Sequence, residues 1–254
     1  MFRGIKSLKK PDSYMDKIRC AVNETIYNKL SLEEKDRING IEQIRKKFTQ
    51  NPTPVDITDF GAGNPDSKRS DDEMLKGITH STTYGAICLG SKPSLWALLL
   101  FKLIKEFQPQ TALELGTCIG ISAAYQATSQ KMNGKGTLIT MEGAESIARL
   151  AEKNIASLHL DNVKVVCGRF GDTLPKVLKE NQTIDYVFID GHHDENATVD
   201  YYEMLLPHLS PRALLVFDDI SWSEGMKRAW KKISCDEKIL LSVDLTMLGI
   251  CVMK

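Results

Sequence analysis

The feature that most constrains this chain is a series of five apolar segments, each ending in glycine or an acidic residue and each followed by a helical pattern. The five segments are TALELG, GTLITMEG, NVKVVCG, IDYVFIDG and ALLVFDDI. Strands that are apolar on both faces and alternate with helices are typical of a parallel sheet that helices cover on both sides. The pattern therefore predicts a doubly wound α/β domain.

Two more apolar segments, ILLSVDL and MLGICVM, follow near the C-terminus, only a few residues apart. A parallel connection needs a crossover of a dozen or more residues, so these two strands are too close to be parallel neighbours. We expect them to form an antiparallel hairpin at one edge. The complete prediction is a mostly parallel sheet of seven strands.

The N-terminal region has a different composition. Ser31 and Glu34 have the spacing of a capping box, which predicts that a helix begins here. An apolar stripe at helical spacing follows, made of Ile38, Ile41, Ile44 and Phe48. The next segment, residues 51–72, is rich in proline and glycine and is predicted to be a loop, or a short strand plus a loop. We divide the chain into a helical extension with a loop, residues 1–80, and an α/β domain, residues 81–254.

Composition excludes several classes of partner. Lysine plus arginine and aspartate plus glutamate both number 33, so the formal net charge is zero and no general nucleic-acid-binding surface is expected. The basic N-terminus lacks the apolar core of a signal peptide, and the run LWALLLF is too short to span a bilayer. The six cysteines form no C-x-x-C pair, which suggests buried, reduced thiols. We expect a cytoplasmic protein with no membrane partner.

A ligand site is expected at the carboxyl ends of the parallel strands, where open α/β sheets bind their ligands. Four of the five predicted strands end in an acid, and such a rim repels phosphates and attracts cations. The turn from Gly116 to Gly120 does not match the G-x-G-x-x-G pattern of dinucleotide sites, and the Glu114 carboxylate would oppose a pyrophosphate. S-adenosylmethionine carries a sulfonium and an ammonium but no phosphate, so the acids favour it over NAD. Glu142, at the end of the second strand, suits the ribose of either cofactor.

Four motifs in this order and spacing carry a family resemblance: LELGTCIGIS, LITMEG, FIDGHH and LLVFDDISW. They resemble the class I S-adenosylmethionine-dependent methyltransferases, and within them the catechol O-methyltransferase-like group. The resemblance covers about Ser91 to Trp222, so residues 1–80 lie outside it. The stretch DFGAG, with EGAE and FDDISWSEGMKRAW, is also similar to a family of uncharacterised bacterial O-methyltransferase homologues. The resemblance implies a Rossmann-like methyltransferase fold.

The resemblance also implies which residues bind the cofactor. It puts the methionine part near the first glycine turn, the ribose near the end of the second strand and the adenine near the end of the third. The predicted cofactor-binding residues are Glu114, Gly116, Thr117, Gly120, Glu142, Gly143, Gly168, Arg169, Phe170 and Asp190. The alternatives are a turn that needs glycine for its conformation alone, a solvated strand end and an ordinary loop.

A metal site is the next implication of the resemblance. Asp190, Asp218 and Asp219 match the three metal-ligand positions of the catechol-type group, with Asp219 standing where that group has asparagine. Hard oxygen ligands suit Mg²⁺ or another divalent cation. Three carboxylates at one point repel each other unless a cation or a proton joins them. The alternative is an acid after the fourth strand that binds no metal, as in many class I methyltransferases.

His193 and Asp190 are the predicted catalytic residues. In the catechol-type group a lysine three positions after the first metal-binding aspartate is the general base, and His193 stands at that position here. Histidine can do the same task. His193 could instead be a metal ligand or an ordinary loop residue. Trp222 is predicted either to line the acceptor pocket or to pack at a helix start.

The predicted function is S-adenosylmethionine-dependent O-methylation of a small-molecule hydroxyl, with or without a divalent cation. The alternatives are a metal-independent N- or O-methyltransferase and a non-catalytic cofactor-binding module. The loop DFGAGNPDSKR is either a lid over the cofactor or a connector. Residues 1–80 are also candidates for a homodimer contact.

Overall fold

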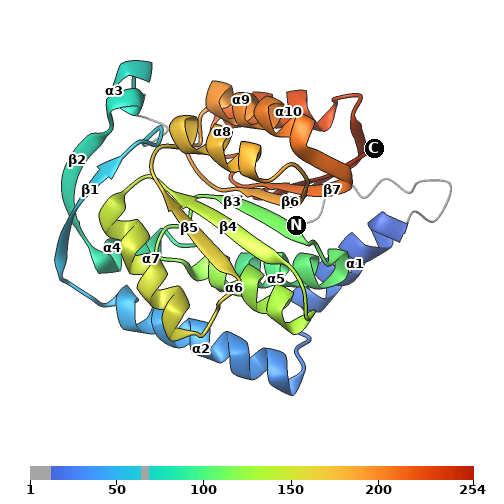
Figure 1. Ribbon diagram of the computed structural model, residues 1–254, viewed down its shortest axis with the longest axis horizontal. Helices are drawn as coiled ribbons and strands as arrows, with labels where there is room; N and C mark the ends of the chain where they lie inside the picture. Colours follow the sequence, from blue (N-terminus) through green and yellow to red (C-terminus); the bar gives the residue numbers. More distant parts are fainter. Residues whose placement is uncertain (1–12, 64–68) are drawn as a thin grey trace.

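The computed structural model describes residues 13–63 and 69–254 and contains the predicted seven-stranded sheet (Figure 1). Strands β3 to β7 pair with one another as parallel neighbours, and β9 runs antiparallel to both β7 and β8. The order across the sheet is β5-β4-β3-β6-β7-β9-β8. The strands are β3 (Thr111–Leu115), β4 (Thr137–Glu142), β5 (Val163–Cys167), β6 (Ile184–Ile189), β7 (Leu209–Phe217), β8 (Ile239–Asp244) and β9 (Gly249–Met253). The fold prediction, including the C-terminal hairpin, is confirmed.

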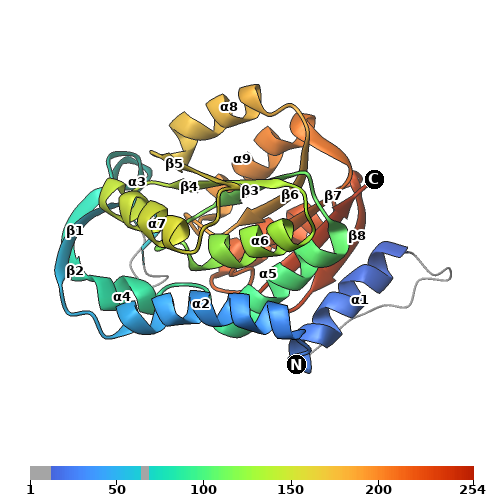
Figure 2. The same ribbon diagram turned by 60° about the horizontal axis from the view of Figure 1, so that its bottom comes forward.

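Helices cover both faces of this sheet, as Figure 2 shows. One face carries α5 (Ser94–Phe107), α6 (Ile121–Met132) and α7 (Glu145–Ser157), and the other carries α8 (Phe170–Glu180) and α9 (Glu195–Leu205). On that second face, α10 (Glu224–Ser234) packs beside α9 (Figure 1). Successive strand residues enter opposite hydrophobic clusters: Tyr186 and Phe188 join one, Val187 and Ile189 the other. This alternation is the two-residue period of a strand, and it explains why the strands are apolar throughout.

The N-terminal helices α1 (Ser13–Ile26) and α2 (Leu32–Thr49) pack on the α5–α6 side of the molecule. The predicted capping box is present, because the Glu34 N–H donates to Ser31 Oγ at 3.1 Å and the Ser31 N–H donates to Glu34 Oε2 at 2.8 Å. Ile38, Ile41 and Phe48 are buried in the same hydrophobic cluster as one face of the sheet. The apolar stripe of α2 therefore covers that layer.

A separate two-stranded ribbon stands at one end of the molecule (Figure 1). Its strands, β1 (Pro54–Asp59) and β2 (Ile78–Thr83), pair antiparallel, and α3 (Asp71–Lys76) lies between them in the sequence. A short helix, α4 (Tyr84–Leu89), links β2 to the segment before α5. We call the described residues between 54 and 83 the arm. Of the segment that the sequence suggested as a lid, residues 64–68 lie outside the described residues.

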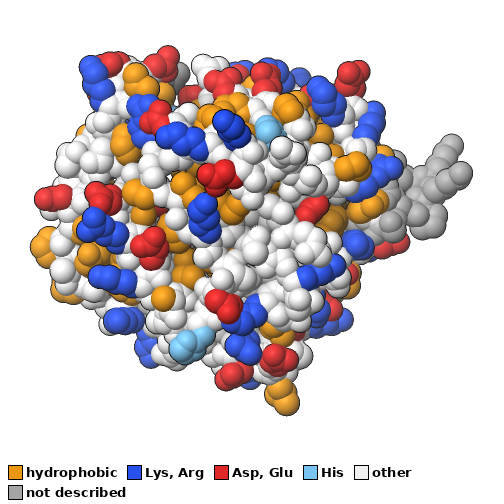
Figure 3. All heavy atoms as spheres, in the orientation of Figure 1, with side chains coloured by type: hydrophobic (Ala, Val, Ile, Leu, Met, Phe, Trp, Pro, Cys, Tyr) orange, Lys and Arg blue, Asp and Glu red, His pale blue; other side chains and the backbone are white. Residues whose placement is uncertain are grey.

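The described surface can be compared with the expectations from composition. Basic and acidic side chains are interspersed on the face shown in Figure 3, with no single basic stripe. Within the described ranges, no helix is long and apolar enough to cross a membrane. All six cysteines are unpaired. Cys167 and Cys235 are exposed, however, so the expectation of buried thiols is wrong for these two, because their strand end and helix end face solvent. The basic N-terminal segment, residues 1–12, lies outside the described residues.

Candidate functional site

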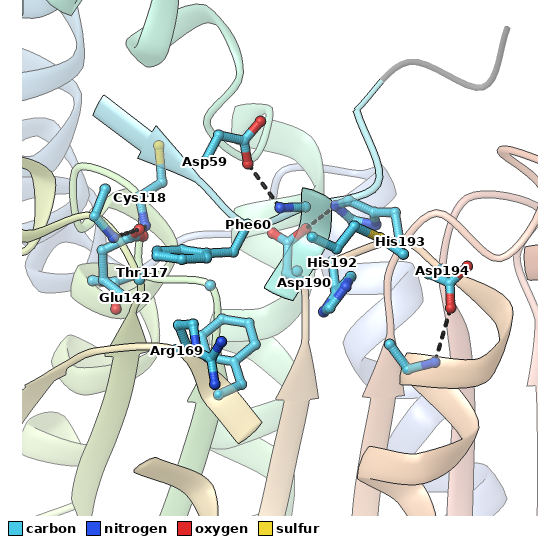
Figure 4. Close-up of a pocket in the computed structure, with 18 of the residues that line it drawn as sticks. Asp59, Phe60, Thr117, Cys118, Glu142, Arg169, Asp190, His192, His193 and Asp194 are labelled. Atoms are coloured by element: carbon cyan, nitrogen blue, oxygen red, sulfur yellow. Dashed lines mark hydrogen bonds and ion pairs between the residues drawn. The ribbon is translucent and has the colours of Figure 1, made fainter. Parts of the chain in front are cut away.

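A cavity of about 540 Å³ lies at the carboxyl ends of the central strands, between the sheet and the arm (Figure 4). Its wall combines the turn after β3, the ends of β4 and β6, the start of α8, the segment before α5, and the arm. This is the position at which open parallel sheets bind ligands, and the order of the strands reverses here, between β3 and β6. The cavity lies at the strand ends where the sequence predicted a ligand site.

The turn after β3 brings the ends of two neighbouring strands together. Gly116 has φ +109°, and a Cβ at this position would lie 2.0 Å from the carbonyl oxygen of Asp190. The N–H groups of Gly116 and Thr117 both donate to the Met141 carbonyl at 3.0 Å, and the Asp190 N–H donates to the Leu115 carbonyl at 2.8 Å. A side chain at Gly116 is therefore excluded by the backbone of β6 as well as by its own conformation.

Glu114 does not reach the cavity, contrary to its predicted place beside the cofactor. Its side chain is fully buried behind the turn, where Gln126 Nε2 donates to Oε1 at 2.6 Å and Thr140 Oγ1 donates to Oε2 at 2.5 Å. Burial raises the pKa of Glu114 to about 7, although these hydrogen bonds act in the opposite direction. Glu114 thus joins β3, β4 and α6 beneath the turn that forms the cavity wall.

Glu142 does line the cavity, at the end of β4. Its Oε2 accepts from the Cys118 N–H at 2.8 Å and its Oε1 from the Ala144 N–H at 3.0 Å. Burial raises the pKa of Glu142, although its hydrogen bonds to backbone N–H groups oppose the rise. A Cβ on the next residue, Gly143, would lie 2.8 Å from the ring of Phe60 in the arm. The arm thus reaches across the cavity to the end of β4, as Figure 4 shows for Phe60.

The segment after β5 supplies a third part of the wall. Arg169 and Phe170 line the cavity, whereas Gly168, with φ +132°, only forms the turn before them. The Arg169 guanidinium makes two hydrogen bonds to the Asp172 carboxylate, at 2.8 and 3.0 Å, and also donates to the Leu75 carbonyl of the arm. The hydrogen bonds of Arg169 therefore connect the arm to α8.

The three predicted metal ligands meet, but a lysine lies against two of them. Lys92 Nζ donates to Asp218 Oδ2 and lies 3.3 Å from Asp190 Oδ2. Lys92 is 9% exposed and Asp218 is 3% exposed, so the contact is almost dry. Burial, with the neighbouring Asp190 charge, raises the pKa of Asp218 to about 8, and burial also raises the pKa of Asp190. Lys92 opposes both shifts.

This arrangement does not fit a divalent cation. The Lys92 ammonium stands between Asp190 and Asp218, and a second cation there would be repelled at short range. In the part of the chain that the structure describes, no group of three or more histidine, cysteine, aspartate or glutamate side chains is arranged to hold a metal ion. The sequence missed Lys92, which precedes the helix α5 and has no sequence spacing that connects it with the strand ends.

His193 lies between two acids of this cluster. Its Nε2 is 3.9 Å from Asp190 Oδ1 and its Nδ1 is 3.8 Å from Asp219 Oδ2. Burial lowers the pKa of His193, although the Asp219 and Asp218 charges oppose this shift. Both His192 and His193 have positive φ, +71° and +51°, so this loop holds a conformation that non-glycine residues seldom adopt. The loop therefore fixes the imidazole of His193 at the cavity wall.

The other polar residues of this stretch have structural partners. His192 Nδ1 lies 2.8 Å from the Tyr201 hydroxyl, Asp194 caps α9 by accepting from the Ala197 N–H at 3.0 Å, and Glu195 pairs with Arg228. Trp222 is 37% exposed and makes an edge contact with the ring of His193, with the centroids 5.5 Å apart. Trp222 does not line the cavity.

The predicted residues therefore fall into two groups. Those that line the cavity are Gly116, Thr117, Glu142, Gly143, Arg169, Phe170, Asp190 and His193. Those that support it from outside its lining are Glu114, Gly120, Gly168, Asp218, Asp219 and Trp222. Phe60 was not singled out by the sequence, although the D-F-G-A-G stretch that contains it was.

Comparison with known proteins agrees with this geometry. Residues 113–220 match the model of a methyltransferase domain family. A catechol O-methyltransferase from Niastella koreensis is 30% identical over 152 residues, which are 59% of this chain and 66% of that protein. The matched part thus spans just under two thirds of this relative. The chain is therefore similar to methyltransferases over residues 113–220, and to this catechol O-methyltransferase over 59% of its length.

Solved structures show the same fold. An O-methyltransferase from Bacillus cereus in complex with SAH has a TM-score of 0.57 at 22% identity, covering 65% of this chain and 83% of that one. TomG from Streptomyces achromogenes, in complex with SAM, has a TM-score of 0.57 at 20% identity, covering 65% and 82%. The SAH-bound methyltransferase PaMTH1 of Podospora anserina has a TM-score of 0.63 at 13% identity and covers 98% of this chain and 99% of that one. The last comparison includes the N-terminal region.

Proposed function

We propose, from the match of residues 113–220 to a methyltransferase domain family, that this chain transfers the methyl group of S-adenosylmethionine to a hydroxyl of a small-molecule acceptor. The observation that carries the proposal is the cavity at the strand reversal, which has the Gly116 turn, the Glu142 carboxylate and the Asp190–His193 loop in one wall. Its volume of about 540 Å³ lies within the range of small-molecule sites. The bound forms of the structural neighbours TomG and PaMTH1 support the choice of cofactor.

The described residues fit an adenosyl cofactor that carries no phosphate. Glu142 keeps lone pairs beyond the two backbone hydrogen bonds that it accepts, so it can also accept from a ribose diol. Phe60 and Phe170 offer aromatic faces and edges to a base. Arg169, the other basic side chain near this part of the wall, is engaged by Asp172 and by the arm. Glu142 and Asp190 make this wall acidic, which favours a sulfonium over a pyrophosphate.

The cofactor would supply a methyl group that is electrophilic because it is bonded to a positive sulfur. An acceptor oxygen would form the new C–O bond as the C–S bond breaks, with the electron pair left on the sulfur. The hydroxyl proton needs a base, and His193 lies in the cavity wall with an imidazole that can take it. Asp190 and Asp219, on either side of that imidazole, stabilise the imidazolium that results.

The arm is proposed as the lid of the cavity. Its Ala62 N–H donates to the His192 carbonyl at 2.7 Å, and its Phe60 ring lies over Gly143. Within the arm, Arg69 pairs with Asp59 at 2.8 Å. These contacts tie the arm to both ends of the cavity, which would exclude water and fix the two substrates in line.

A labelled-methyl transfer screen tests the function. Phenols, catechols, aliphatic alcohols and amines of matched shape are offered with methyl-labelled cofactor, and we expect label in an ether product and stoichiometric S-adenosylhomocysteine. His193→Ala should lower the rate by about 100-fold or more, since general bases contribute ~10²–10⁴-fold. His208→Ala, just before β7 and outside the cavity lining, is the matched control. Label found only in amines would support N-methylation, and cofactor binding without turnover would support a binding module.

A homodimer is a further part of the proposal. Ile26, Tyr27 and Leu32 are each exposed and lie close in sequence, at the end of α1 and the start of α2. Apolar side chains grouped on a surface favour association with another copy. Light scattering on the purified chain should give the mass of a dimer, and Tyr27→Asp with Leu32→Asp should shift it to a monomer. A monomeric mass for the unaltered chain would contradict this.

A further inference from the structure

Lys92 places a positive charge between two of the acidic residues at this site. Lys92 belongs to the segment just before α5, far in sequence from the ends of β6 and β7 that carry Asp190 and Asp218. Its Nζ contacts the carboxylates of both residues. These are two of the three positions at which the resemblance implies a divalent cation. A side chain of this chain therefore occupies the position between the acids.

The surroundings of Lys92 hold its ammonium at this point. The side chain is 9% exposed, and its Nζ lies 5.9 Å from the centroid of the Phe188 ring, within the range of a cation–π contact. A third carboxylate, Asp219, adds to the negative charge around it. Moving this ammonium away would leave the buried carboxyl groups of Asp190 and Asp218 without their cationic partner. The Lys92 ammonium is therefore held in place, and a metal ion would have to displace it to bind the same carboxylates.

Lys92 also faces the reacting region. It lines the cavity, together with Asp190 and His193. An ammonium has three N–H donors, and its two carboxylate partners leave one for a further acceptor. A hydroxyl bound beside His193 can accept that hydrogen bond. The developing negative charge on its oxygen would then be stabilised by a fixed positive charge in a nearly dry site.

We propose that the Lys92 ammonium is the built-in cation of this site: it stands between Asp190 and Asp218, donates to the acceptor oxygen, and makes methyl transfer independent of a divalent metal. This inference rests on the proposed function and deepens it. The acceptor proton goes to His193 and the methyl group goes to the acceptor oxygen. Lys92 keeps its three protons throughout, so it contributes charge and orientation alone.

Manganese binding tests the proposal without any assay of activity. Mn²⁺ is titrated into the full chain and followed by its electron paramagnetic resonance signal. We expect no binding to the unaltered chain beyond that of a chain carrying Asp190→Asn. Lys92→Met removes the ammonium and frees the carboxylates, so Mn²⁺ should bind about 10-fold more tightly or better. Lys105→Met, a lysine substitution in a separate ion-pair cluster, should leave Mn²⁺ binding unchanged.

Methyl-transfer activity provides the second test. Methyl transfer by the unaltered chain should be the same in excess EDTA as in Mg²⁺. Lys92→Met should lower the rate by about 100-fold, the loss expected for one preorganised electrostatic donor. Lys92→Arg should recover part of the rate, since it restores the charge. S-adenosylhomocysteine titration on each variant shows whether the cofactor site still folds.

Two results would overturn the inference. The first is tight Mn²⁺ binding by the unaltered chain that Asp190→Asn removes, together with loss of transfer in EDTA. The second is full EDTA-resistant transfer by Lys92→Met. Neither result touches the proposed methyltransferase function. If the unaltered chain methylates no acceptor, the proposed function fails, while the Mn²⁺ titration still decides what occupies the position between the acids.

Discussion

Two buried lysines, Lys92 and Lys102, show how the same interaction serves different ends in this molecule. Both lie in or just before α5, and both contact two carboxylates. Lys102 Nζ lies 2.8 Å from Glu24 and 3.1 Å from Glu34, at the junction of α1, α2 and α5. Lys102 lies away from the cavity, whereas Lys92 forms part of its wall.

The balance of charge separates the two clusters. At the junction, Lys102 and Lys105 face Glu24 and Glu34, so positive and negative charges are equal. Burial raises the pKa values of both glutamates, but the lysines outweigh it and the net shift is downward. At the cavity, Lys92 faces Asp190 in the wall and Asp218 and Asp219 behind it, and the pKa values of all three aspartates are raised. A balanced cluster serves stability, and an unbalanced one beside a cavity indicates function.

The largest expected effect comes from breaking the balanced cluster. Lys102→Met removes the fully buried cation that lies 2.8 Å from Glu24 and 3.1 Å from Glu34. Removing one member of a buried pair typically costs about 3–5 kcal/mol. Urea denaturation measures the change in free energy of unfolding. Lys105, which is 39% exposed, is the control, and Lys105→Met should cost at most about 1 kcal/mol. Equal losses of unfolding free energy for the two variants would mean that burial of Lys102 does not make its ion pairs more important than those of Lys105.

The next effect should fall on activity. Asp190→Asn keeps the shape of the side chain but removes a charge from the unbalanced cluster. We expect transfer to fall about 100-fold, equivalent to ~2.7 kcal/mol in the barrier, with a much smaller loss of stability than Lys102→Met. Initial-rate kinetics and urea denaturation on the same preparation separate the two quantities. A large stability loss with unchanged activity would reverse the roles that we assign to the clusters.

The smallest effect is a pH dependence at the junction. Because the folded-state pKa of Glu34 is lowered, its contribution to stability is present above the unfolded pKa and disappears as the pH falls through the folded value. The unaltered chain should therefore lose more stability between pH 6 and pH 3 than Glu34→Gln does. Thermal melts across this range measure the difference. Parallel pH curves for the two chains would show that Glu34 is not held ionised by the lysines.

The sequence predicted the elements well and the side-chain directions less well. The apolar strands and the Ser31–Glu34 box follow from local patterns, and the structure contains them. Glu114 was expected at the cavity because it ends a strand. Side chains alternate along a strand, however, and Glu114 faces α6, on the side opposite Leu113 and Leu115. The strand end could be located from the sequence, but the face could not.

Contacts between segments that are far apart in the sequence could not be predicted either. Lys92 meets Asp218 across 126 residues of sequence, and no spacing or propensity connects them. β1 pairs with β2 across α3, so the ribbon could be predicted only as a short strand and loop. The arm reaches His192 by the same kind of contact. The parts of the site that local patterns missed are those that only tertiary packing brings together.

The most direct test of the account is calorimetric titration of S-adenosylhomocysteine into the chain in EDTA. We predict a dissociation constant on the order of 10 μM, equivalent to about −7 kcal/mol. Glu142→Ala should weaken binding by about 10-fold or more, because the ribose loses a charged hydrogen-bond acceptor. Absence of binding by the unaltered chain at ligand concentrations up to about 1 mM, or about −4 kcal/mol, would contradict the assignment of the cavity.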